Sequence, residues 1–127
     1  MNIEVKFFEG SLTKAIGAGI YGIYAEHNGK KDLLYIGESV FVLVRCATHL
    51  YEIAKGIGYL GFTKEKLDDE VTIVFELLSE EEEPNRGIRK VKEKEKIKNM
   101  HPIMQSGISD RVKSVEEMID ALVNLLN

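Results

Sequence analysis

The order of hydrophobic and polar residues along the chain predicts four strands. The first is a weakly alternating segment over Asn2–Phe8. Two more, Gly19–Ala25 and Leu33–Gly37, flank an Asn28-Gly29 pair, and Asn-Gly supplies the positive φ angles that a tight hairpin turn requires. β-branched and aromatic residues over Val71–Leu78 predict the fourth strand.

Helices are predicted in the remaining segments. Crowded apolar residues over Val40–Lys55, without Pro or Gly before Gly56, predict a largely buried helix that Gly56 ends. A second helix is predicted over Ser79–Met100, since its first glutamates complement the helix dipole and Pro84 is tolerated near a first turn. The glycine-rich stretch Gly56–Phe62 between these helices is predicted to be a loop.

Three shorter or terminal helical segments complete the prediction. Ser11 can cap a short helical turn, and Thr63 can begin a helix that ends near Asp69. A capping-box pattern at Ser114 opens a C-terminal amphipathic helix. Its wide apolar stripe within 115–126 either covers the core or meets a second copy of the chain or a partner protein.

Together these elements predict an α+β fold. We expect a small, mainly antiparallel sheet of three strands, with the N-terminal strand added and helices around it. A length of 127 residues suits one domain with one core, so residues 1–127 are expected to form a single domain. The N-terminal strand and the C-terminal amphipathic helix are additions to its central part.

Composition indicates an ordinary globular protein, with 44% hydrophobic and 30% charged residues and no apolar run that could span a bilayer, so no membrane partner is expected. The N-terminus lacks the layout of a secretory signal, and Cys46 is the sole cysteine. A single cysteine excludes an intramolecular disulfide and fits a reducing compartment, so we expect a cytoplasmic protein.

The charge distribution bears on nucleic-acid binding. A net charge of −4 argues against such binding, because DNA-binding domains usually carry a basic excess. The segment 86–98 is an exception, since it holds seven basic residues against two glutamates, a local net charge of +5. Two interpretations of this segment are open: a solvated helix face with i,i+4 ion pairs, or a strip that faces phosphates.

Two tripeptides on the predicted hairpin, Gly19-Ile20-Tyr21 and Tyr35-Ile36-Gly37, carry the most specific signal in the chain. Their arrangement resembles the GIY-YIG endonuclease family, and the resemblance extends from Gly19 to Gln105. It implies a GIY-YIG-like nuclease domain, a hydrolase that cuts phosphodiester bonds in nucleic acid, DNA in our interpretation, with Mg²⁺ or Mn²⁺. A binding module of the same fold without turnover is the alternative.

The first tripeptide is repeated at Gly22-Ile23-Tyr24, so either Tyr21 or Tyr24 can be the motif tyrosine. The shorter separation from Tyr35 favours Tyr24, and a two-residue turn pairs Tyr24 with Leu33, which is expected to place it on the face of Tyr35. The family pattern has an apolar residue two positions after its first tyrosine. Because Ile23 matches this pattern, we favour Tyr21, with the extra residues in the hairpin tip.

The resemblance also assigns residues beyond the tyrosines. Arg45 and His49 match the arginine and histidine that the family carries on the helix after its second motif, one helical turn apart. A guanidinium there suits phosphate, since it offers parallel N–H donors and a permanent charge. Glu93, nine residues before Pro102, matches the family's metal-binding glutamate, and Glu95 is its rival. One carboxylate suffices, because Mg²⁺ usually takes one or two protein carboxylates and keeps several waters.

Two residues depart from the family pattern. Gln105 stands where many members have asparagine, and Glu38 stands where a lysine or a neutral polar residue is frequent. Glu38 would repel a scissile phosphate unless it turns away or joins the metal shell. The implied mechanism has Tyr21, assisted by Tyr35 or His49, deprotonate an attacking water. It requires these groups, Arg45 and Glu93 to meet in one solvent-reachable hollow.

Overall fold

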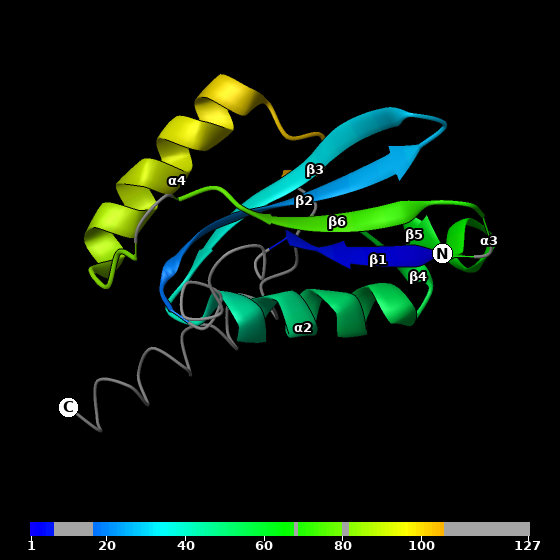
Figure 1. Cartoon of the computed structure of the whole chain (residues 1–127), viewed down its shortest axis with the longest axis horizontal. Coiled ribbons are helices and arrows are strands. Elements are labelled where there is room, and N and C mark those ends of the chain that lie inside the picture. Colours follow the sequence, from blue (N-terminus) through cyan, green and yellow to red (C-terminus); the bar gives the residue numbers. More distant parts are fainter. Residues whose placement is uncertain (7–16, 68, 80–81, 106–127) are drawn as a thin grey trace.

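The computed structural model of the protein describes residues 1–6, 17–67, 69–79 and 82–105. A four-stranded sheet with the order β1-β6-β2-β3 lies at its centre (Figure 1). The strands span Asn2–Val5 (β1), Gly19–His27 (β2), Lys30–Ser39 (β3) and Thr72–Leu77 (β6). β1 is parallel to β6, whereas β6, β2 and β3 are antiparallel neighbours. The predicted α+β fold with three antiparallel strands and an added N-terminal strand is therefore confirmed.

The β2–β3 hairpin forms at the predicted turn. Asn28 and Gly29 have φ angles of 52° and 78°, the left-handed conformations that a two-residue hairpin turn needs. Both strands are longer than predicted and reach the turn directly, so the residues that we expected in a hairpin tip extend the ladder to His27 and Lys30.

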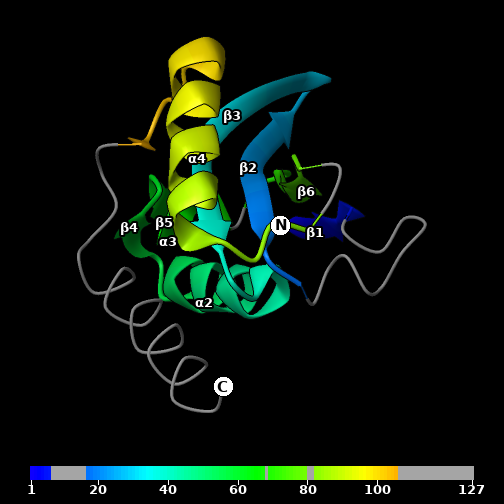
Figure 2. The same cartoon turned by 90° about the vertical axis from the view of Figure 1, so that its left-hand side faces the viewer.

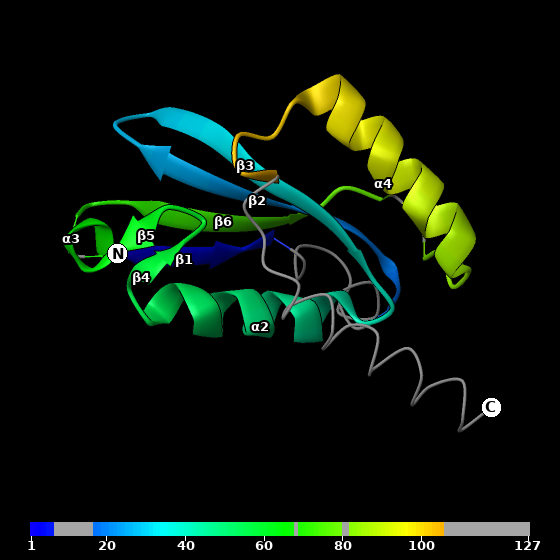
Figure 3. The same cartoon turned by 180° about the vertical axis from the view of Figure 1, so that it is seen from behind.

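Helices α2 (Val42–Ala54) and α4 (Arg86–Met100) contact opposite faces of the sheet. Side chains alternate along a strand, so Tyr21, which contacts α2, and Ile20, whose pairing partner Glu38 contacts α4, lie on different faces. Figure 2 shows α4 beside β3, with α2 running beneath the strands, and Figure 3 shows the same arrangement from behind.

The main hydrophobic core lies between the sheet and α2. Ile23, Ile73 and Phe75 point to this face from β2 and β6, and they pack against Val42 and Ile53 of α2, all of them at most 1% exposed. Full burial of each such side chain stabilises the fold by about 1.5–3 kcal/mol relative to exposure. The core therefore determines how α2, the helix that carries Arg45 and His49, sits against the tyrosine-bearing strands.

The prediction of a loop over Gly56–Phe62 is wrong. This segment contains strand β4 (Ile57–Tyr59), which pairs with β5 (Phe62–Thr63). The turn between them is Leu60-Gly61, with φ angles of 53° and 83°. Leucine is uncommon at positive φ, so the turn carried no sequence signal. Helix α3 (Lys64–Leu67) follows within the predicted range, and Gly56 (φ 66°) ends α2 as expected.

The prediction that the second long helix begins at Ser79 is also wrong. Helix α4 begins at Arg86, where the Asn85 side chain caps it by accepting a hydrogen bond from the Ile88 N–H at 3.0 Å. Pro84 precedes this cap, outside the helix. The predicted turn after Ser11 and the C-terminal helix after Ser114 lie outside the described residues.

Candidate active site

The register of the hairpin places Tyr21 and Tyr35 on one face of the sheet. Tyr21 pairs with Gly37 and Ile23 pairs with Tyr35, and the two phenol rings lie 6.3 Å apart. Tyr24 pairs with Leu33 as predicted, but an irregularity between Ile23 and Tyr24 leaves Leu34 without a partner. This bulge shifts the alternation by one residue, so Tyr24 lies on the other face, beneath the Lys31 ammonium. The expectation that Tyr24 shares the face of Tyr35 is wrong.

The motif glycines make room for side chains. A Cβ at Gly37 would overlap the ring and hydroxyl of Tyr21, which crosses the backbone of the neighbouring strand. A Cβ at Gly19 would lie 2.6 Å from the Ser79 Oγ, which accepts a hydrogen bond from the Ile20 N–H. Gly37 thus allows the phenol of Tyr21 to lie flat against the hairpin, next to Tyr35.

Helix α2 contributes Arg45 and His49 to the same place. The two residues are one turn apart and are 4% and 0% exposed. Arg45 Nε donates a hydrogen bond to the Tyr21 hydroxyl at 3.1 Å, and His49 Nε2 lies 2.7 Å from that hydroxyl. The His49 ring is 5.2 Å from the Tyr35 ring. Four predicted site residues therefore form one cluster, the tyrosine cluster: Tyr21, Tyr35, Arg45 and His49.

Burial governs the protonation of the cluster. Burial, assisted by the positive charge of Arg45, holds the pKa of His49 well below its usual value near 6.5, so its imidazole is neutral at physiological pH. Burial also raises the pKa of Tyr35, and although the charge and hydrogen bond of Arg45 oppose this shift, the negative charges of Glu93 and Glu38 add to it. Tyr35 is therefore a protonated phenol at neutral pH.

Glu93 of α4 acts on this cluster through its charge. Glu93 is half-buried, and its negative charge raises the pKa of the Tyr35 phenol. The pKa of Tyr35 is therefore influenced by the charges of both Arg45 and Glu93. The rival Glu95 is exposed and lines a hollow with Ile20, on the face of β2 opposite Tyr21. Position thus distinguishes the two glutamates, and Glu93 is the one near the tyrosines.

The carboxylate of Glu93 fits a magnesium ion in chemistry. Mg²⁺ prefers oxygen ligands, and one protein carboxylate is enough when water and substrate oxygens complete the shell. The described part of the chain has no group of three His, Cys, Asp or Glu side chains that could enclose a metal. A metal at this position would use the Glu93 carboxylate, and water and substrate oxygens can complete its shell.

Glu38 turns away from the tyrosine cluster. Its side chain is 1% exposed, accepts a hydrogen bond from Arg89 Nε at 2.7 Å, and lies 3.1 Å from Lys90 Nζ. Arg89 is equally buried and also donates to the carbonyl oxygens of Glu83 and Pro84. The carboxylate that departed from the family pattern is thus neutralised, and it attaches α4 to β3.

Gln105 has a structural contact. Its side-chain oxygen accepts from the Ile36 N–H and its amide donates to the Ile36 carbonyl, both at 2.9 Å. The carboxamide therefore occupies the hydrogen-bonding groups of β3, the strand at one edge of the sheet, in the way that a neighbouring strand would. This use of both amide atoms argues against a direct contact with substrate.

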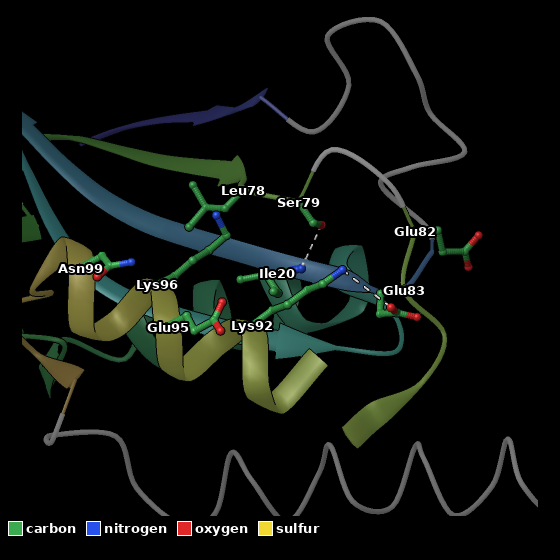
Figure 4. A pocket seen from close by; sticks show the side chains of 9 residues that line it. All are labelled: Ile20, Leu78, Ser79, Glu82, Glu83, Lys92, Glu95, Lys96 and Asn99. Carbon is green, nitrogen blue, oxygen red and sulfur yellow. Dashed lines mark hydrogen bonds and ion pairs between the residues drawn. The ribbon is translucent and has the colours of Figure 1, made fainter. Parts of the chain in front are cut away.

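The basic segment of α4 is partly neutralised. Arg89 and Lys90 pair with Glu38, and Lys92 pairs with Glu83 at 3.6 Å. Lys92 and Lys96 line the hollow of about 520 Å³ that Figure 4 shows, together with Glu82, Glu83 and Glu95. These contacts argue against a continuous strip for phosphates, but they join α4 to residues outside it and bury Arg89, so they are not the i,i+4 pairs of a solvated helix face.

Access to the tyrosine cluster is restricted. Its four side chains are at most 5% exposed, whereas we expected a solvent-reachable hollow. Catalysis by this cluster therefore requires a substrate to uncover it. Two contacts were not predicted from the sequence: the Tyr59 hydroxyl lies 2.7 Å from His49 Nδ1 of the cluster, and Arg89 holds Glu38 on the other face of the sheet. The one available signal for Tyr59 was a tyrosine between two glycines, at 58 and 61.

Among the described helices, none has the length and apolar character needed to cross a bilayer. Searches against profiles of known protein families, curated proteins and solved structures found no match to the chain.

Proposed function

We propose that this protein is a metal-dependent endonuclease that hydrolyses phosphodiester bonds in DNA. One observation carries the proposal: Tyr21, Tyr35, Arg45 and His49 converge in one cluster, and the Tyr35 phenol lies under the charges of both Arg45 and Glu93. These residues come from two strands and two helices, and each was assigned a role by the resemblance to GIY-YIG nucleases.

The contacts of the cluster support Tyr21 as the general base. Its hydroxyl touches both Arg45, a permanent cation that favours the phenolate, and His49, a neutral imidazole that can take up a proton. Tyr35 stays protonated and orients groups by hydrogen bonding. Of the two assistants considered for Tyr21, the contacts favour His49.

The reaction follows from these roles. A water gives its proton to the Tyr21 phenolate while its oxygen bonds to phosphorus, and the bond from phosphorus to the leaving 3′ oxygen breaks. Arg45 stabilises the charge that grows on the non-bridging oxygens. Glu93 would hold a divalent ion, and such an ion would supply positive charge to offset the charge that develops on the leaving oxygen.

Cleavage of supercoiled plasmid by the full chain, with Mg²⁺ or Mn²⁺, tests the proposal. We expect nicked and linear products with either ion and none with EDTA. Glu93→Gln should lower the rate by about a hundredfold or more, a typical effect of removing one electrostatic group. Glu95→Gln, an isosteric change two residues away on the other side of α4, is the matched control and should retain most of the rate. Equal losses in both variants, or no cleavage by the wild type, would reject the proposal.

A non-catalytic binding module is the second candidate function. The burial of the tyrosine cluster favours it, because side chains at most 5% exposed are poorly placed to act on a phosphodiester. It predicts that the same protein shifts DNA in a gel without cutting it, with an affinity that falls as salt rises. Retention of DNA without products in either metal would select this function.

A further inference from the structure

Tyr59 extends the hydrogen-bonded chain of the site beyond the four assigned residues. The Tyr59 hydroxyl lies 2.7 Å from His49 Nδ1, and the two rings are 5.9 Å apart. On the other side of the imidazole, Nε2 lies 2.7 Å from the Tyr21 hydroxyl, to which Arg45 Nε donates. Hydrogen bonds thus link Arg45, Tyr21, His49 and Tyr59 in that order. They connect the fully buried phenol of Tyr21 to the half-buried phenol of Tyr59.

The β4–β5 hairpin holds Tyr59 in this position. Leu60, next in sequence, is 6% exposed, and Phe62, the pairing partner of Tyr59 across the turn, is 4% exposed. Both pack into the main core beside α2. The left-handed φ of Leu60, 53°, is rare for leucine and persists only where surrounding packing imposes it. Packing of the hairpin therefore determines where the Tyr59 hydroxyl lies relative to His49.

We propose that Tyr59 is a positioning residue of this site, which selects the Nδ1–H tautomer of His49 and passes a proton from Tyr21 to solvent. The tautomer follows from donor and acceptor roles. Arg45 can only donate, so the Tyr21 oxygen accepts from it, and we assign the Tyr21 hydroxyl proton to the bond with His49 Nε2. The single proton of the neutral imidazole is then on Nδ1 and is donated to the Tyr59 oxygen.

The transfer rests on the proposed nuclease function and its protons balance. The Tyr21 hydroxyl proton moves to His49 Nε2, the Nδ1 proton moves to the Tyr59 oxygen, and the Tyr59 hydroxyl proton leaves to water. His49 ends as the Nε2–H tautomer, and the Tyr21 phenolate accepts from both Arg45 and His49. No imidazolium needs to persist, which suits a buried ring beside a guanidinium. The phenolate then takes the proton of the attacking water.

Nitrogen NMR of the histidine side chains tests the tautomer without any need for activity. We expect His49 in the wild type to show the Nδ1–H tautomer at neutral pH. In Tyr59→Phe, Nδ1 loses its acceptor, so most of the population should shift to Nε2–H. Tyr51→Phe is the matched control, because Tyr51 is 66% exposed on α2 and should leave the tautomer unchanged. Nε2–H in the wild type, or no shift in Tyr59→Phe, would overturn the proposal.

Cleavage kinetics test the transfer. In Tyr59→Phe we expect kcat to fall by about tenfold with KM unchanged, a modest part of the effect usual for general acid–base groups. Tyr51→Phe should keep the wild-type kcat. A cleaving wild type with an unchanged kcat in Tyr59→Phe would overturn the transfer and leave the nuclease function intact. A wild type that does not cleave, with the expected tautomers, would reject the nuclease function and the transfer while the positioning role stands.

Discussion

Replacement of Arg89 by methionine is expected to lower the free energy of unfolding by about 3–5 kcal/mol, the usual cost of removing one partner of a buried ion pair. Arg89 and Glu38 side chains are each 1% exposed, with Nε and Oε2 2.7 Å apart. At that distance the attraction is about 6 kcal/mol for an effective dielectric constant near 20, before the cost of dehydration. Methionine keeps an apolar stem but leaves the Glu38 carboxylate buried without the guanidinium.

Lys90→Met is the matched control for this prediction. Lys90 contacts the same carboxylate at 3.1 Å, but its side chain is 43% exposed, so its loss should cost less than about 1 kcal/mol. Urea unfolding followed by circular dichroism measures both changes. For Arg89→Met we also expect a melting temperature lower by roughly 10–20 °C. Equal unfolding free energies for the two variants would refute the reasoning that burial makes the Glu38–Arg89 pair contribute more to stability than the exposed Lys90 contact.

Three further predictions concern the tyrosine cluster and the core. Gly37→Ala should destabilise the fold by about 1–3 kcal/mol, because its Cβ would overlap the Tyr21 ring; an unchanged unfolding midpoint would contradict this. Stability should fall as pH drops below 6.5, by up to about 1.4 kcal/mol per pH unit, because unfolded His49 takes up a proton that the folded ring refuses. His49→Gln should flatten this slope, and an equal slope in both proteins would argue against the neutral buried imidazole. The Cys46 thiol, 2% exposed and with a pKa raised by burial to about 12, should resist maleimide at pH 8 until the chain unfolds; rapid labelling of folded protein would contradict its burial.

Local sequence determined much of the fold. The Asn28-Gly29 turn, the end of α2 at Gly56 and the strand at 72–77 follow from backbone preferences that act within a few residues, and the structure shows all three. The spacing of Arg45 and His49 also predicted that they share a helix face, because one turn separates them. Such features depend on neighbours along the chain, so the sequence suffices to predict them.

Local sequence did not predict the contacts that depend on strand register or on an unusual turn conformation. A single bulge opposite Ile23 and Tyr24 determined which tyrosine joins Tyr35, and no residue type near Leu34 announces it. The Leu60-Gly61 turn has a leucine in a conformation that leucine rarely adopts, which concealed both the β4–β5 hairpin and Tyr59.

Only the tertiary structure decided which charges and hydrogen bonds meet. Glu38 and Arg89 are 51 positions apart, and Gln105 and Ile36 are 69 apart, so no periodicity connects them. Residue type gave these side chains a charge or an amide. Burial makes such a polar group costly to leave unpaired, and the packing of the elements selected its partner. The sequence therefore supplied the chemical groups of the candidate site, whereas the packing of α2 and α4 on opposite faces of the sheet determined which of them lie within hydrogen-bonding distance.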